Sequence, residues 1–188
     1  AKVLLKDSEG NYALDIALEH KNPECSYILA AKVANLMQAF LGREKKVAKK
    51  DASADAEKAA ADRKHLVEVI SKIDGPPAPA ELCDILRLAE ALHTESRKDK
   101  KTGNVILKIN EPLEDDGMTV LHHASKCGEC SVAGVLLQCG ADVLMLTHPA
   151  EGLPALSAVD IAVKEKKWDM AKMLGKRLVY IIEPAKKK

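Results

Sequence analysis

The sequence predicts an all-α fold, in which short helix–turn–helix units stack into a solenoid that carries a helical insertion. Only 3% of the 188 residues are aromatic, so the core must be filled by Leu, Ile, Val, Ala and Met. That composition suits packed helices better than sheets. Hydrophobic residues at 47% and charged residues at 30% favour a folded, soluble chain. The third observation is a helix–turn–helix pattern that is clearest in the last half of the chain.

The clearest unit spans residues 115–146. It begins with the turn signal Asp116-Gly117, and Thr119 follows as the cap of a short helix. Gly128 is placed to stop this helix, and Gly140 to end a second one. The inward positions of the two helices are Leu121, Ala124, Val132, Val135 and Leu136. Because neither helix can bury its apolar face alone, the unit requires stacked neighbours.

This unit closely resembles an ankyrin repeat. The positions that match the family's pattern are Gly117, Thr119, Leu121, His122, Ala124, Gly128, Leu136, Leu137, Gly140, Ala141 and Asp142. Val120 stands where the family has Pro. The resemblance implies that His122 is structural and that stacked units offer turn tips and first helices to a protein partner.

Two weaker units share this register, at about residues 7–33 and 147–178. In the first, Gly10, Leu14 and Ala17 match the pattern, with Tyr12 at the Thr position and Asp15 at the His position. In the other, the matching residues are Ser157, Val159, Asp160 and Ala162, and Lys166 replaces the glycine that would stop the helix. We expect the units near the two ends of the chain to pack against one another.

The middle of the chain lacks the repeat pattern. We therefore divide the chain into an N-terminal repeat (1–41), a helical insertion or degenerate repeats (42–110), and two C-terminal repeats with a basic tail (111–188). Residues 43–64 alternate Ala with charged residues and are read as an exposed helix or a linker. Apolar stripes predict helices around 66–73 and from Pro79 to about Ser96, and residues 105–109 read as a short extended segment.

The motifs that could carry chemistry each have a structural alternative. Cys127 and Cys130 have the spacing of a redox pair, but Cys127 falls at the C-terminal end of a helix, where the dipole disfavours a thiolate. A zinc site with His122 or His123 lacks a second cysteine pair. Lysine clusters at 45–50, 98–101 and 186–188 lack the aromatic residues that stack on bases. Thiol redox activity and weak nucleic-acid binding therefore remain as alternatives.

The leading hypothesis is a non-catalytic protein–protein interaction module that acts as an accessory or scaffolding subunit. We expect no cofactor, no metal, no nucleic acid, no transmembrane segment and no small-molecule substrate; the partner is another protein or a multi-subunit complex. The formal charge of +1 supplies no global pull toward nucleic acid, and five cysteines in a Lys-rich chain indicate an intracellular compartment, cytoplasmic or within an organelle. The residues expected to bind the partner are Asp115, Asp116, Met118, His123 and Lys126.

Overall fold

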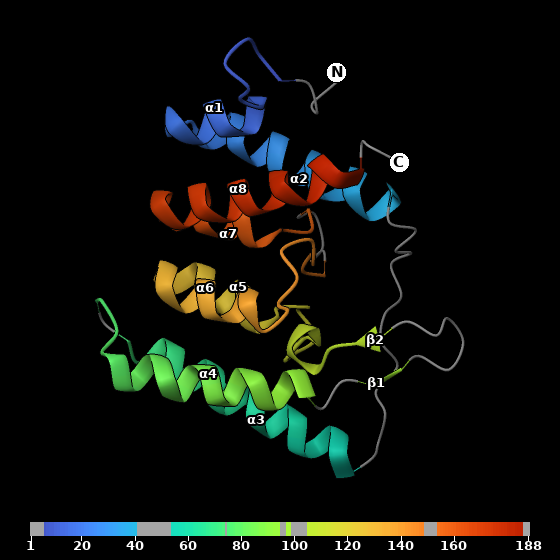
Figure 1. Cartoon of the computed structure of the whole chain (residues 1–188), viewed down its shortest axis with the longest axis vertical. Helices are drawn as coiled ribbons and strands as arrows, with labels where there is room; N and C mark the ends of the chain where they lie inside the picture. The colour runs from blue at the N-terminus through green and yellow to red at the C-terminus, as the bar shows by residue number, and fades with distance from the viewer. Residues whose placement is uncertain are drawn as a thin grey trace. The chain divides into compact units, whose positions relative to one another are not determined.

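The computed structural model describes residues 6–40, 54–73, 75–94, 97–98, 105–148 and 154–185. Within these ranges the chain forms eight α-helices, one short 3-10 helix and a hairpin of two very short strands (Figure 1). The chain divides into two compact units, one made of Ala1–Lys46 with Val143–Lys188 and the other of Val47–Asp142. The predicted class, a helical fold built from two-helix units, is confirmed.

The first unit combines the two ends of the chain. It contains α1 (Ala13–Glu19), α2 (Pro23–Phe40), α7 (Ala158–Lys164) and α8 (Trp168–Ala185). Helix α1 packs on α8 and α2 packs on α7, so the first helix pair stacks against the last pair, as the sequence led us to expect. The pairing is crossed, because the first helix of one pair lies on the second helix of the other. Fully buried side chains in this unit include Leu14, Leu18, Val159, Met170 and Leu174.

The second unit is continuous in sequence. It contains α3 (Ala54–Ser71), α4 (Pro79–Thr94), β1 (Arg97–Lys98), β2 (Val105–Ile106), η1 (Lys108–Asn110), α5 (Val120–Cys127) and α6 (Cys130–Gln138). The two strands pair antiparallel. Here the stacking is in register, since α3 packs on α5 and α4 packs on α6. The core is aliphatic, as the composition predicts, and includes Leu66, Ile70, Ile85, Leu92, Leu121 and Leu136.

Several expectations for the middle of the chain can be compared with this unit. The extended segment expected at 105–109 is β2 followed by η1, and the stripe around 66–73 belongs to α3. Of the charged segment 43–64, residues 43–53 lie outside the described part of the chain and the rest is helical. The compact units have other boundaries than the three predicted segments, because the last helix pair packs with the first. Whether residues 42–110 are an insertion or degenerate repeats stays a prediction.

Three of the first helices, α1, α5 and α7, begin with the same reciprocal cap. In each, the residue before the helix donates its backbone N–H to the side chain three positions later. The side chain of the first residue faces the backbone N–H of that later residue in return. The pairs and their distances are Tyr12 with Asp15 (3.0 Å), Thr119 with His122 (3.0 Å) and Ser157 with Asp160 (2.7 Å). The two weaker units therefore share with the clearest unit the same local arrangement at the start of the first helix.

Each of the same three helices is followed within two residues by a residue with a left-handed backbone. These residues are Lys21 (φ 51°), Gly128 (φ 89°) and Lys166 (φ 59°). The sequence indicates a stop at Gly128 and at Asn22-Pro23, whereas Lys166 stands where a glycine would stop the helix. The structure shows that the turn forms there nonetheless, with a lysine in a conformation that glycine adopts more easily.

A close contact at Gly140 joins three elements of the second unit. Gly140 follows α6 with φ 88°, and its carbonyl accepts a 3.0 Å hydrogen bond from Asn110 Nδ2. The Oδ1 atom of Asn110 accepts from the N–H of Asp142 at 2.8 Å. A Cβ at Gly140 would lie 2.6 Å from Leu107 Cδ1 and 3.3 Å from His93 Nδ1. The left-handed backbone favours glycine at this position, and a side chain there would also have to displace Leu107.

We therefore expect Gly140→Ala to lower the free energy of unfolding by about 2 kcal/mol or more, because it combines a left-handed alanine with overpacking. Gly134→Ala in α6 is the matched control, since nothing lies within 4 Å of a Cβ there. The control should raise the free energy of unfolding by about 0.5–1 kcal/mol through helix propensity. Urea unfolding of both variants provides the measurement, and equal effects would show that the contact at Gly140 does not form.

The cap of α7 buries a carboxyl group. Asp160 is inaccessible to solvent; its Oδ2 accepts from the N–H of Ser157, while Oδ1 has no hydrogen-bond partner among the described residues. Burial raises the pKa of Asp160 to about 6, although the bonds from Ser157 act in the opposite direction. Burial raises the pKa of Tyr27 on α2, and the charges of Asp160 and Glu165 raise it further. Tyr27 therefore lies within electrostatic range of Asp160.

This burial predicts a pH dependence. The folded chain keeps the Asp160 proton to a higher pH than the unfolded chain, so the contribution of Asp160 to the free energy of unfolding falls as the pH rises from about 4 to above 6. Asp160→Asn keeps an acceptor oxygen for Ser157 but cannot ionise. The free energy of unfolding of this variant, minus that of the original chain, should therefore rise by up to about 3 kcal/mol between pH 4 and pH 7. Glu165→Gln, at an exposed carboxylate, should show no such trend in the same unfolding series.

Candidate functional site

The predicted partner-binding residues lie on the turn before α5 and on α5 itself. Asp115 and Asp116 are exposed on the turn, and Met118 is half-buried behind them. The turn is held by short hydrogen bonds: the N–H of Met118 donates to Asp116 Oδ1 at 2.9 Å, and its carbonyl accepts from the N–H of Leu113 at 3.0 Å. The backbone of the turn is therefore fixed while the two carboxylates remain accessible.

On α5, His123 and Lys126 lie nearly one helical turn apart. Lys126 is exposed and His123 is half-buried. Burial is the largest influence on His123 and lowers its pKa; Asp116 and Glu114 act to raise it, and Lys126 acts to lower it. The structure thus brings His123, Asp116 and Lys126 within electrostatic range of one another. At neutral pH the imidazole is uncharged and can both donate and accept a hydrogen bond.

The neighbouring histidines have separate roles. His122 is buried, and its Nδ1 accepts from the N–H of Thr119 at 3.0 Å and lies 3.0 Å from the Thr119 hydroxyl. His122 therefore fixes the start of α5, whereas His123, one residue later, faces away from the core. This separation agrees with the structural role that the sequence assigned to His122.

The sequence did not predict a group of buried charges next to the segment that leads into the turn before α5. Arg63 on α3 is only 6% exposed, and its Nη1 donates to Glu111 Oε2 at 3.0 Å and to the Lys108 carbonyl at 3.2 Å. Lys108 Nζ lies 3.7 Å from Glu111 Oε1. Burial lowers the pKa of Arg63, and the charge of Glu111 opposes that shift. The group ties η1 to α3 and so positions the chain that leads into the Asp115–Asp116 turn.

The cysteine pair has the surroundings that the sequence indicated. Cys127 is the last residue of α5, directly before Gly128, and Cys130 is the first residue of α6. Both are half-buried. Trp168, at the start of α8, is also half-buried. In the described ranges no three His, Cys, Asp or Glu side chains converge on a point where a metal ion could bind.

Most residues of the predicted lysine clusters cannot be compared with the structure. Lys45, Lys46, Lys49, Lys50 and the tail 186–188 lie outside the described residues, as does most of the 98–101 cluster. Among the helices that the structure describes, none combines the length and the apolar character needed to cross a membrane.

These features define a class of protein, a helical-repeat protein whose best-formed unit is the turn, α5 and α6. Residues 116–148 match the ankyrin repeat family model, which covers nearly the same segment as the unit recognised from its residues. No curated protein matches the chain. Ankyrin repeats are typically protein–protein interaction modules without enzymatic activity, and this is the class of function that the match indicates.

Proposed function

We propose that this chain is a non-catalytic protein–protein interaction module that works inside the cell as an accessory or scaffolding subunit of a larger assembly. The partner binds the turn and first helix of the matched repeat, which we call the α5 surface. Its residues are Asp115, Asp116, Met118, His123 and Lys126. The observation that carries the proposal is the coincidence of this accessible, chemically mixed surface with the segment that matches an ankyrin repeat.

The chemistry of the α5 surface suits a protein partner. Met118 offers a flexible apolar contact among charged residues of the same turn and helix, a mixture that is usual in protein interfaces. Asp116 and Lys126 carry opposite charges and both lie within electrostatic range of His123, so a partner with complementary charges is favoured. Because hydrogen bonds already hold the backbone of the turn, binding requires little further ordering.

The surroundings of the reactive side chains support a non-catalytic role. The turn carboxylates are exposed, whereas general acid–base catalysis requires a carboxyl group whose pKa is shifted by burial or by a close like charge. Cys127 lies at the C-terminal end of α5, where the helix dipole opposes a thiolate.

The proposal predicts that capture of the partner depends on the α5 surface. The full chain, immobilised through a terminal tag, should retain a specific protein from an extract of its own cells. Met118→Ser combined with His123→Ala should reduce that retention about tenfold or more, because both remove contacts at the centre of the surface. Quantitative mass spectrometry of the retained proteins measures the effect.

Arg87→Ala is the matched control, since Arg87 is an exposed residue of α4 whose 3.2 Å ion pair with Asp84 is also exposed. The control should retain the partner fully, and the thermal unfolding midpoints of both variants should show that the fold persists. Equal retention by all three proteins, or loss in the control alone, would contradict the proposal.

A further inference from the structure

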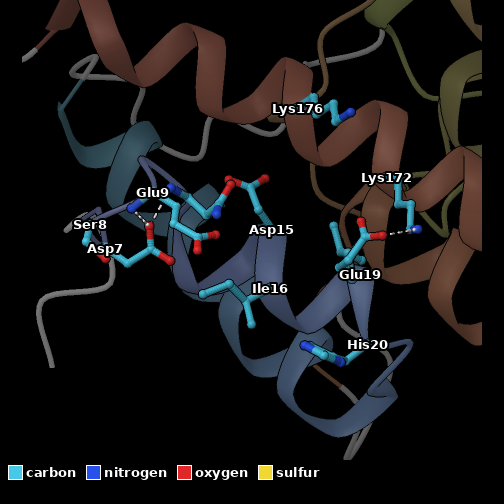
Figure 2. A pocket seen from close by; sticks show the side chains of 11 residues that line it. Asp7, Ser8, Glu9, Asp15, Ile16, Glu19, His20, Lys172 and Lys176 are labelled. Atoms are coloured by element: carbon cyan, nitrogen blue, oxygen red, sulfur yellow. Dashed lines mark hydrogen bonds and ion pairs between the residues drawn. The ribbon is translucent and has the colours of Figure 1, made fainter.

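A second surface lies on the first unit, where α1 meets α8. An open pocket of about 630 Å³ is lined by the loop before α1, by one side of α1 and by two lysines of α8 (Figure 2). It exists because the stacking here is crossed: α1 lies against the second helix of the last pair. We propose that this pocket binds an arginine side chain presented by a partner protein.

The negative wall of the pocket is held in a fixed shape. Asp7 Oδ1 accepts hydrogen bonds from the N–H groups of Glu9 and Asn11, both at 2.9 Å. The bonds to the backbone lower the pKa of Asp7, so its carboxylate is charged at neutral pH. Asp15 is held by its bond to the N–H of Tyr12. Two carboxylates are therefore placed by the backbone before any ligand arrives.

The floor of the pocket is apolar. Ile16 is 40% exposed, one of the few large hydrophobic side chains of the described chain that face solvent, and the buried Leu18 also lines the pocket. A Cβ at Gly175 of α8 would lie 2.6 Å from Leu18 Cδ1, so the glycine permits α1 to approach α8 closely.

The charges of the lining select a cation. The lining carries four carboxylates, those of Asp7, Glu9, Asp15 and Glu19, and two lysines, of which Lys172 is paired with Glu19 at 3.3 Å (Figure 2). A metal ion is a poor match, because within the described ranges no set of acidic side chains converges to coordinate one.

Arginine fits both parts of the pocket. Its alkyl stem can lie on Ile16, and its planar guanidinium presents several N–H donors to carboxylates that lie apart. Lysine offers the same charge as a compact, strongly hydrated ammonium, so it gains less from carboxylates spread along the wall. This site shares no residue with the α5 surface, and each can fail without the other.

Nuclear magnetic resonance of the full, isotopically labelled chain tests the proposal. The probe is arginine capped as its N-acetyl N-methylamide, with the same derivative of lysine and of citrulline, a neutral shape analogue of arginine, as comparisons. We expect saturable shifts at the amides of residues 15–19 and 172–176 that weaken as salt is added, with binding about threefold or more weaker for lysine and absent for citrulline.

Charge-removing variants complete the test. Glu9→Gln and Glu19→Gln should each weaken arginine binding about threefold, whereas Glu165→Gln, which removes an exposed carboxylate outside the pocket, should leave it unchanged. The spectra themselves report whether each variant remains folded. The proposal is overturned if no saturable shifts occur at low salt, if citrulline binds as well as arginine, or if the pocket variants bind like the control.

Discussion

The structure depends on one constraint: a pair of short amphipathic helices cannot bury its apolar face without a second pair. Both units satisfy this constraint with aliphatic side chains, because Leu, Ile, Val and Ala are buried where two helix pairs meet. The polar groups left over at the helix starts are satisfied locally by the reciprocal caps. What remains for function is the set of turn and first-helix positions that neither packing nor capping requires.

The orientation of the stacking is where the two units differ. In the second unit like helices face each other, whereas in the first unit α1 lies on α8 and α2 on α7. Apolar burial is not directional, so an amphipathic pair can satisfy it in either orientation. The crossed arrangement has a consequence for recognition, because it forms a pocket whose lining comes from α1 and α8, helices from opposite ends of the chain.

The sequence predicted the features that depend on neighbours along the chain. Thr119 as a cap, Gly128 as a stop and the structural position of His122 follow from residues within one turn of a helix. It could not predict the Arg63–Glu111 contact, the fit of Leu107 against Gly140 or the pocket at Ile16, since each joins residues distant in the chain. At Lys166 the local rule failed, because backbone hydrogen bonds from the N–H of Lys166 to the Val163 carbonyl (3.0 Å) and from the N–H of Lys167 to the Ala162 carbonyl (2.8 Å) close the turn without a glycine.

The central claim is that a protein partner binds the α5 surface, and site-specific photocrosslinking tests it most directly. A photoreactive amino acid at position 126, which is exposed on α5, should form a covalent adduct with one protein partner in cells. The same residue at position 131, exposed on α6, should give little or no adduct with that protein. Equal labelling from both positions, or none from position 126, would contradict the account.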